Sequence, residues 1–319
     1  MIKKTVAAML AASLAAGAAA TPAELTAPGP QGALAGTLIA PAAGQPLVLI
    51  VPGSGPTDRD GNNPMGVTAA PYRLLAEALA ARGVGSLRID KRGMFGSKAA
   101  VADPNAVTVT DYVGDVSAWV SAARAETGLS CVWLLGHSEG GLVALAAAGK
   151  VEHLCGVILV AAPGEKFAEV LRKQLRANPA NAPLLPDALG AIDRLERGER
   201  VDVAGFHPAL QGLFNPGVQG FLIDLFAYDP AALAAKVGRP LLIVQGGKDL
   251  QVPHVNGEAL HAANPAARYV VVPDMNHVLK DIKADSPQAN MAAYADPSLP
   301  ISPELVDAIS DFVRAGDQR

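Results

Sequence analysis

Short apolar runs alternate with amphipathic stretches along most of the chain. The apolar runs are nearly continuous, which is typical of strands buried on both faces of a sheet. We expect strands at 33–40, 46–51, 84–89, 132–135, 157–161, 241–245 and 269–272. Between several of these runs, leucine and alanine recur at helical spacing. We expect helices at 72–81, 112–127, 140–150 and 303–314.

The alternation of strands and helices predicts the α/β class, with a mostly parallel sheet and helices on both of its faces. Crossovers between parallel strands are expected to be right-handed. The first two strands are separated only by a short Pro/Gly turn at 41–45. A connection that short favours antiparallel strands, so we expect the sheet to begin antiparallel.

One long segment, 165–236, breaks the alternation, because it is rich in Arg, Leu and Pro and has helical periodicity without strand signals. We interpret it as a helical cap inserted over the carboxyl edge of the sheet. The core would then comprise 21–164 and 237–319. The alternative is a helical surface excursion unrelated to any site, since long insertions are usually but not always functional.

The first twenty residues resemble a secretory signal peptide. Lys3 and Lys4 precede a short alanine-rich apolar stretch, and Ala18-Ala19-Ala20 offers the small residues that a signal peptidase needs. We expect export to the periplasm or the medium; an uncleaved N-terminal anchor is the alternative. No later stretch of eighteen apolar residues is found, so we expect no stable membrane insertion after cleavage.

Composition narrows the possible partners. The formal net charge is −4 and aromatic residues make up 4% of the chain, so a nucleic-acid-binding face has no support. We find no metal-ligand spacing and no dinucleotide fingerprint after a strand, and we expect neither a metal nor a cofactor.

The two cysteines, Cys131 and Cys155, precede strands expected to be neighbours. A disulfide is therefore feasible, although we favour two small buried thiols.

The sharpest motif is Gly136-His137-Ser138-Glu139-Gly140, which matches G-x-S-x-G. In a nucleophile elbow a strand turns sharply into a helix with the serine at the apex, and the glycines avoid clashes there. An apolar run precedes this motif and a small-residue helix follows it. We therefore predict that Ser138 is a nucleophile.

A serine hydroxyl needs a base to accept its proton, and near neutral pH that base is usually a histidine. Of six histidines, His277 alone follows the last strand at the edge where ligands bind in open α/β sheets. A third residue, an acid whose carboxylate orients the histidine, is expected between the serine and the histidine in chain order, as in other proteins with a nucleophile elbow. Asp249, just after the penultimate strand, fits best. The rivals Asp224, Asp229 and Asp274 are expected to cap helices or lie in solvated loops.

The oxyanion of a tetrahedral intermediate needs backbone N–H donors. We expect one from Glu139 and the other from the loop after strand 46–51, with Ser54 the first choice and Gly55 the second. Gly53 and Gly55 let that backbone approach a substrate closely; an ordinary Gly/Pro turn is the alternative.

Two charged segments, Asp58-Arg59-Asp60 and Asp90-Lys91-Arg92, also follow strands at this edge. Arg59 or Arg92 is expected to pair with Asp60, Asp90 or Glu139. We favour an ion network that braces the oxyanion loop over a role in substrate binding.

Taken together, these motifs resemble bacterial α/β-hydrolase esterases, which are also grouped with serine aminopeptidase-like hydrolases. The matching segments are 32–38, 52–61, 90–97, 136–141, 246–253 and 276–277. The resemblance implies the α/β-hydrolase fold, a Ser138–Asp249–His277 triad, oxyanion donors at Ser54 and Glu139, and hydrolysis of small carboxylic esters with short to medium acyl chains.

The chain departs from this pattern at Phe95, where a small residue is common, and a bulky group there is expected to narrow the substrate pocket or to pack inward. An aminopeptidase or amidase is the second hypothesis, and would need an acidic subsite, for which Glu139, Glu165 and Glu169 are candidates. A catalytically silent binding protein on the same fold is the third.

Overall fold

The computed structural model describes residues 21–317, so the predicted signal peptide lies outside the described residues. Its centre is an eight-stranded sheet in the order β1-β2-β4-β3-β5-β6-β7-β8. The strands are β1 (Ala23–Ala27), β2 (Leu34–Ile39), β3 (Leu47–Val51), β4 (Gly85–Ile89), β5 (Val132–His137), β6 (Leu154–Val160), β7 (Leu241–Gly246) and β8 (Arg268–Val272). From β4 to β8 all neighbours are parallel, whereas β1–β2 and β2–β4 are antiparallel. The predicted mostly parallel sheet is confirmed.

The start of the sheet differs in one respect from the expectation. The short turn does reverse the chain, but β2 and β3 are not paired, because β4 lies between them and bonds to both. Strand β1 was not expected from the sequence. It pairs only with β2 at the edge of the sheet, and four of its five residues are at least partly exposed.

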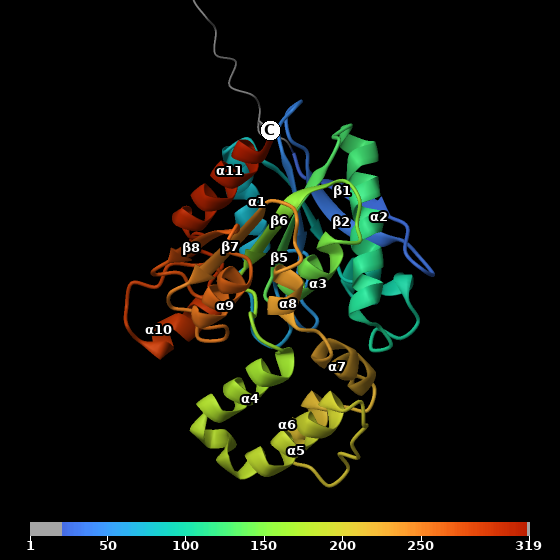
Figure 1. Cartoon of the computed structure of the whole chain (residues 1–319), viewed down its shortest axis with the longest axis vertical. Helices are drawn as coiled ribbons and strands as arrows, with labels where there is room; N and C mark the ends of the chain where they lie inside the picture. Colours follow the sequence, from blue (N-terminus) through green and yellow to red (C-terminus); the bar gives the residue numbers. More distant parts are fainter. Residues whose placement is uncertain (1–20, 318–319) are drawn as a thin grey trace, which may run out of the picture.

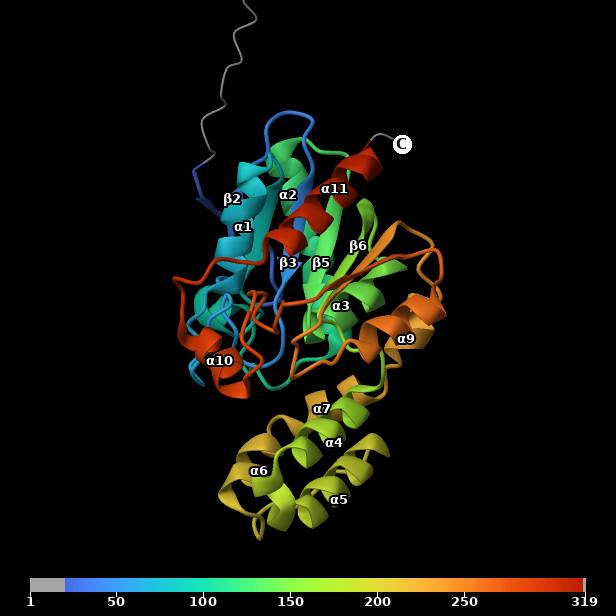
Figure 2. The same cartoon turned by 90° about the vertical axis from the view of Figure 1, so that its left-hand side faces the viewer.

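Helices cover both faces of the sheet. Helices α1 (Pro71–Ala81) and α11 (Pro303–Asp317) pack on one face, and Figure 2 shows both in front of the strands. The opposite face is covered by α2 (Val109–Thr127), α3 (Glu139–Ala148) and α9 (Val255–Ala263). Strand β3 shows why both layers form: Val48 and Ile50 pack toward the first layer, while Leu47, Leu49 and Val51 pack toward the second. A strand buried on both faces favours the continuous apolar run seen in the sequence.

Between β6 and β7 the chain leaves the sheet and forms a helical cap. Its helices are α4 (Phe167–Ala177), α5 (Leu185–Glu196), α6 (Pro208–Leu213), α7 (Gln219–Phe226) and α8 (Pro230–Ala234), with a 3₁₀ segment at Pro179–Leu184. Helices α4 to α7 form a group beyond one end of the sheet (Figure 1), and α7 contacts α2 of the core. Helix α8 contacts α3 and α9, so the end of the predicted 165–236 segment packs on the core. Arg172 joins α4 to α5 through ion pairs with Asp193 and Glu196.

The remaining elements are short and connect the layers. Two further 3₁₀ segments lie at Phe95–Ala100 and Ala293–Ala295, and a short helix, α10, at Pro287–Ala292. No helix within 21–317 has the length and apolar character needed to cross a membrane.

The two cysteines correct one expectation. Cys131 and Cys155 form a disulfide, with their Cα atoms 5.2 Å apart, rather than the two free thiols that we favoured. Cys131 lies directly before β5 and Cys155 lies near the start of β6, which is its neighbour in the sheet. The pairing of these two strands therefore brings the cysteines within bonding reach.

Candidate active site

Ser138 stands at the turn between β5 and α3, with φ 54° and ψ −123°. Residues other than glycine rarely adopt a positive φ, so the surrounding structure has to hold Ser138 in this conformation. The Ser138 N–H donates to the carbonyl of Val160 on β6 at 3.0 Å. A Cβ on Gly136 would come 2.1 Å from the carbonyl oxygen of Gly140, and one on Gly140 would come 2.4 Å from that of Val51. The strained strand–serine–helix turn predicted from the motif is thus present.

His277 and Asp249 are hydrogen-bonded to each other at the same edge of the sheet. Asp249 follows β7 and His277 follows β8, and the Asp249 Oδ2 atom lies 2.8 Å from His277 Nδ1. The other carboxylate oxygen, Oδ1, accepts from the backbone N–H groups of Gln251 and Val252, both at 2.8 Å. Because a carboxylate oxygen can only accept, His277 carries its proton on Nδ1, and in the neutral ring Nε2 is then unprotonated.

The loop after β3 passes beside the serine. A Cβ on Gly53 would lie 3.2 Å from the Ser138 Cβ, so only a residue without a side chain fits comfortably there. The Gly53 N–H donates to the Tyr72 hydroxyl at 3.0 Å. Within 21–317, by contrast, the N–H groups of Ser54 and Glu139 have no hydrogen-bond acceptor. These two donors are therefore free to bind an oxyanion, which is the role expected of them.

His137, which precedes the serine in the chain, joins two parts of the site. Its Nε2 atom lies 2.9 Å from the carbonyl oxygen of His277, which can only accept, so Nε2 carries the proton. Its Nδ1 atom then accepts from the Tyr72 hydroxyl at 2.8 Å. Burial lowers the pKa of His137 well below its ordinary value, and the neighbouring His277 lowers it further. The neutral ring thus links the loop of His277 to Tyr72 and, through it, to Gly53.

A pocket of about 430 Å³ opens above these residues, between the core and the cap. Ser138 and His277 both line it, together with Gly53 and Ser54. Most of the remaining wall is apolar: Met65, Val67, Pro71, Pro163, Phe167, Val170, Leu171, Leu213, Val252 and Val278. Among the described residues that line the pocket there is no Asp, Glu, Lys or Arg. A volume of this size suits a small, largely uncharged ligand.

Two residues expected at the pocket lie outside its wall. Phe95 is 44% exposed and does not line the pocket, so the expectation that it narrows the substrate space is wrong. Its backbone has φ 45° at the start of the 3₁₀ segment Phe95–Ala100. Gly55, with φ 69°, also lies outside the wall, whereas Ser54, the preferred donor residue, lines it.

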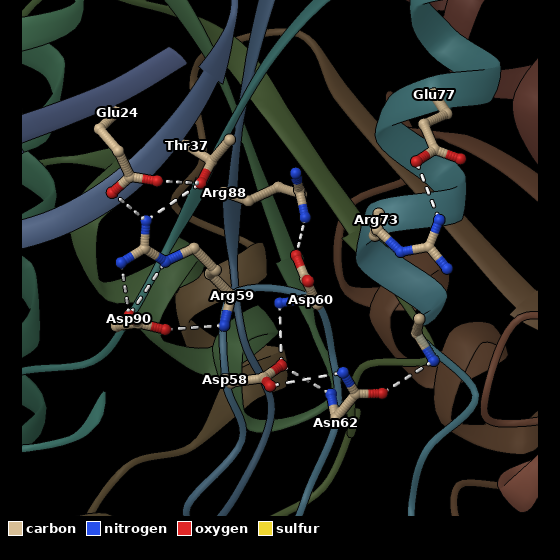
Figure 3. Close-up of polar contacts among 11 residues, drawn as sticks. Glu24, Thr37, Asp58, Arg59, Asp60, Asn62, Arg73, Glu77, Arg88 and Asp90 are labelled. Carbon is tan, nitrogen blue, oxygen red and sulfur yellow. Dashed lines mark hydrogen bonds and ion pairs between the residues drawn. The ribbon is translucent and has the colours of Figure 1, made fainter. Parts of the chain in front are cut away.

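The charged segments beside the oxyanion loop form the ion network that we favoured (Figure 3). Arg59 pairs with Asp90 at 2.9 Å and with Glu24 at 2.8 Å, and its backbone N–H donates to Asp90 Oδ1. Arg88 bonds Asp60. None of these charged side chains lines the pocket. The network therefore braces the loop that follows β3 and does not contact a ligand there.

Arg92 does not join this network. It pairs instead with Asp115 and Asp111 on α2, at 2.7 and 3.0 Å. The partner of Glu139 is Lys91, whose ammonium lies 3.7 Å from Glu139 Oε1. The sequence did not single out Lys91 or Tyr72. The sequence shows only that each is a polar residue at the end of a buried element. It does not indicate which group the side chain contacts.

A mostly parallel eight-stranded sheet, a serine elbow at its carboxyl edge and a cap between β6 and β7 define the α/β-hydrolase class. Within that class, residues 65–281 match the family model for serine aminopeptidase, S33. The chain belongs to this family of α/β-hydrolases.

A curated relative is Esterase EstD of Thermotoga maritima, which is 28% identical over 245 residues. That alignment covers 73% of this chain and 54% of the relative, so the chain spans about half of the relative's length. Solved structures with the same fold include the following two. The thermophilic esterase of Thermogutta terrifontis, in a malate-bound form, has a TM-score of 0.56 and 19% identity over 93% of this chain and 100% of its own. The proline iminopeptidase of Mycobacterium smegmatis has a TM-score of 0.59 and 17% identity over 93% and 99%.

Proposed function

We propose that this protein is a serine esterase that hydrolyses small, uncharged carboxylic esters of short to medium acyl chain through an acyl-enzyme. The observation that carries the proposal is the 2.8 Å bond between His277 Nδ1 and Asp249, at the pocket that both His277 and Ser138 line. The bond orients the imidazole, and the elbow presents the hydroxyl.

The reaction would proceed in two halves. The Ser138 Oγ attacks the ester carbonyl carbon while His277 Nε2 takes its proton, and the N–H groups of Ser54 and Glu139 bind the resulting oxyanion. The C–O bond then breaks, and the imidazolium returns the proton to the departing alcohol. In the second half a water molecule gives a proton to His277 and attacks the acyl carbonyl carbon. The bond from that carbon to Ser138 Oγ then breaks, the imidazolium returns the proton to Oγ, and the acid leaves.

The uncharged pocket wall favours ester substrates over peptides that carry a free amino terminus. An aminopeptidase would need a carboxylate to hold the substrate's ammonium group. Each of the three acidic candidates already has a cation: Glu139 pairs with Lys91, Glu165 with Lys173, and Glu169 with Arg172. The family model and the iminopeptidase-like fold keep amide hydrolysis as the second candidate function.

We also propose that the protein is exported to the periplasm or the medium. The charged and apolar pattern of residues 1–20 supports this proposal, and so does a disulfide, which persists in oxidising compartments.

A panel of p-nitrophenyl esters of increasing acyl length, run beside amino-acid p-nitroanilides, tests the proposed activity. We expect turnover of the esters, little turnover of the anilides, and a loss of several orders of magnitude in kcat for Ser138→Ala. Faster turnover of the anilides would favour the aminopeptidase. No turnover of either, with an unreactive Ser138, would favour a silent binding protein.

A further inference from the structure

One buried cation contacts both segments that carry the expected oxyanion donors. Lys91 follows β4 and is 5% exposed. Its Nζ atom donates to the carbonyl oxygen of Gly53 at 2.7 Å and lies 3.7 Å from Glu139 Oε1. Gly53 precedes Ser54 in the loop after β3, and Glu139 follows the nucleophile. A single ammonium thus lies behind both halves of the proposed oxyanion hole.

The geometry of a peptide bond turns this contact into a constraint on Ser54. The carbonyl of Gly53 and the N–H of Ser54 belong to one peptide, which is planar and trans, so they point in opposite directions. When Lys91 holds the carbonyl on the buried side, the Ser54 N–H is directed to the other side, where Ser54 lines the pocket. The Gly53 N–H, held by Tyr72, fixes the preceding peptide as well.

The two distances show which partner the ammonium serves. The contact with the Gly53 carbonyl, at 2.7 Å, is a short charge-assisted hydrogen bond, whereas the contact with Glu139 is a looser ion pair. A buried ion pair is weak evidence for stability, because removing two charges from water costs about as much as their attraction returns. The carboxylate is better explained as the countercharge that keeps an ammonium in place at the carbonyl.

Lys91 lies in a poorly solvated region, where its charge acts strongly on neighbouring dipoles. Together with Glu139, Tyr112 and Trp119 it lines a cavity of only about 10 Å³, which has room for about one water molecule. Burial lowers the pKa of Lys91, and Glu139 opposes that shift. In such a poorly solvated region a charge acts more strongly on neighbouring dipoles than it does in water.

We propose that Lys91 is a positioning residue of the oxyanion hole, a role that rests on the proposed esterase activity. Its ammonium fixes the orientation of the Gly53–Ser54 peptide and polarises it, which strengthens the Ser54 N–H as a donor to the developing oxyanion. Glu139 supplies the countercharge through its side chain and the second donor through its backbone. Lys91 itself does not line the pocket and contacts no reacting atom.

The test compares wild type with Lys91→Met, which keeps an unbranched side chain only one atom shorter and removes the ammonium. We expect kcat on a p-nitrophenyl ester to fall about 30- to 300-fold, with KM within about threefold, because an oxyanion donor acts mainly on the transition state. The affinity for a trifluoromethyl ketone, which forms a tetrahedral adduct with the serine, should fall in proportion to kcat/KM.

Two further variants separate positioning from folding. Lys91→Met/Glu139→Gln leaves no unpaired carboxylate, and we expect it to fold and to show the same loss of kcat. Arg239→Met is the matched control at the amino edge of the sheet, where the guanidinium donates to the carbonyls of Leu154 and Ala148 at 2.6 and 3.3 Å. It removes a cation from backbone carbonyls far from the pocket, so we expect a lower Tm and an unchanged kcat.

The proposal is overturned if the folded double variant keeps kcat within about threefold of wild type, or if KM and kcat change together while the ketone binds as before. A wild type that hydrolyses no ester refutes the proposed function instead. In that event the rate of Ser138 labelling by a fluorophosphonate still tests Lys91, and an equal rate in Lys91→Met and wild type would refute its role.

Discussion

Replacing Asp249 with Asn tests how the histidine is oriented. The carboxylate has two fixed neighbours, since Oδ1 accepts from the N–H groups of Gln251 and Val252 and Oδ2 faces His277 Nδ1. An Asn side chain has to keep its carbonyl oxygen toward the two backbone donors, because its NH₂ group would face N–H groups there. The NH₂ group therefore faces Nδ1 of His277. That nitrogen becomes an acceptor, the proton moves to Nε2, and the base is lost.

We expect a large loss of kcat, because fixed partners on both oxygens of Asp249 set its orientation. The Asp249 side chain is fully buried, so water cannot replace the lost bond. We expect kcat to fall about 10⁴-fold, as for the same substitution in a serine protease triad, which corresponds to about 5.4 kcal/mol of barrier. The two backbone bonds persist in the variant, so Tm should change little. The assay is p-nitrophenyl ester hydrolysis at pH 7.5 beside a thermal melt. A folded Asp249→Asn variant with less than about a tenfold loss of kcat would refute this reasoning.

Three other predictions concern the pocket, the buried histidine and the disulfide. Phe167→Ala, which enlarges the pocket from α4, should lower kcat/KM about tenfold for the longer acyl chains and little for acetate, measured across the ester panel; a uniform effect would argue against contact with the acyl chain. The neutral His137 is protonated more readily in the unfolded chain, so stability is lost as pH falls below about 6.5. Between pH 7.5 and 5.5, urea unfolding should show wild type losing about 1.4 kcal/mol more than His137→Gln; equal losses would contradict the burial argument. Cys131→Ala/Cys155→Ala should lower the free energy of unfolding by about 3 kcal/mol, because the disulfide spans a sequence separation of 24, whereas an unchanged urea midpoint would show that the bond contributes nothing.

Sequence reasoning predicted the fold, which the structure confirms, and it proposed three side chains for a triad, because the signals for both are local. The elbow motif specifies a strand, a strained serine and a helix in consecutive residues, and Asp249 and His277 each follow an apolar run directly. The carboxyl ends of parallel strands lie at one edge of the sheet, so the sequence alone predicts that these three positions lie near one another.

Non-local pairing accounts for what the sequence left open. In the sheet, β4 lies between β2 and β3. The short turn that joins β2 to β3 does not indicate that another strand separates them. Strand β1 has one buried residue, so it lacks an apolar run. The pairing of the cysteines depends on how closely the starts of β5 and β6 approach, and the role of Lys91 depends on which carbonyl lies opposite its ammonium.

Reaction with an alkyl fluorophosphonate, followed by mass spectrometry of the peptides, tests most directly whether Ser138 is an activated nucleophile. We predict a single covalent adduct, on the peptide that contains Ser138, formed in wild type and absent or strongly slowed in His277→Ala. An adduct on another serine, or equal labelling of Ser138 when the imidazole of residue 277 is removed, would contradict the account.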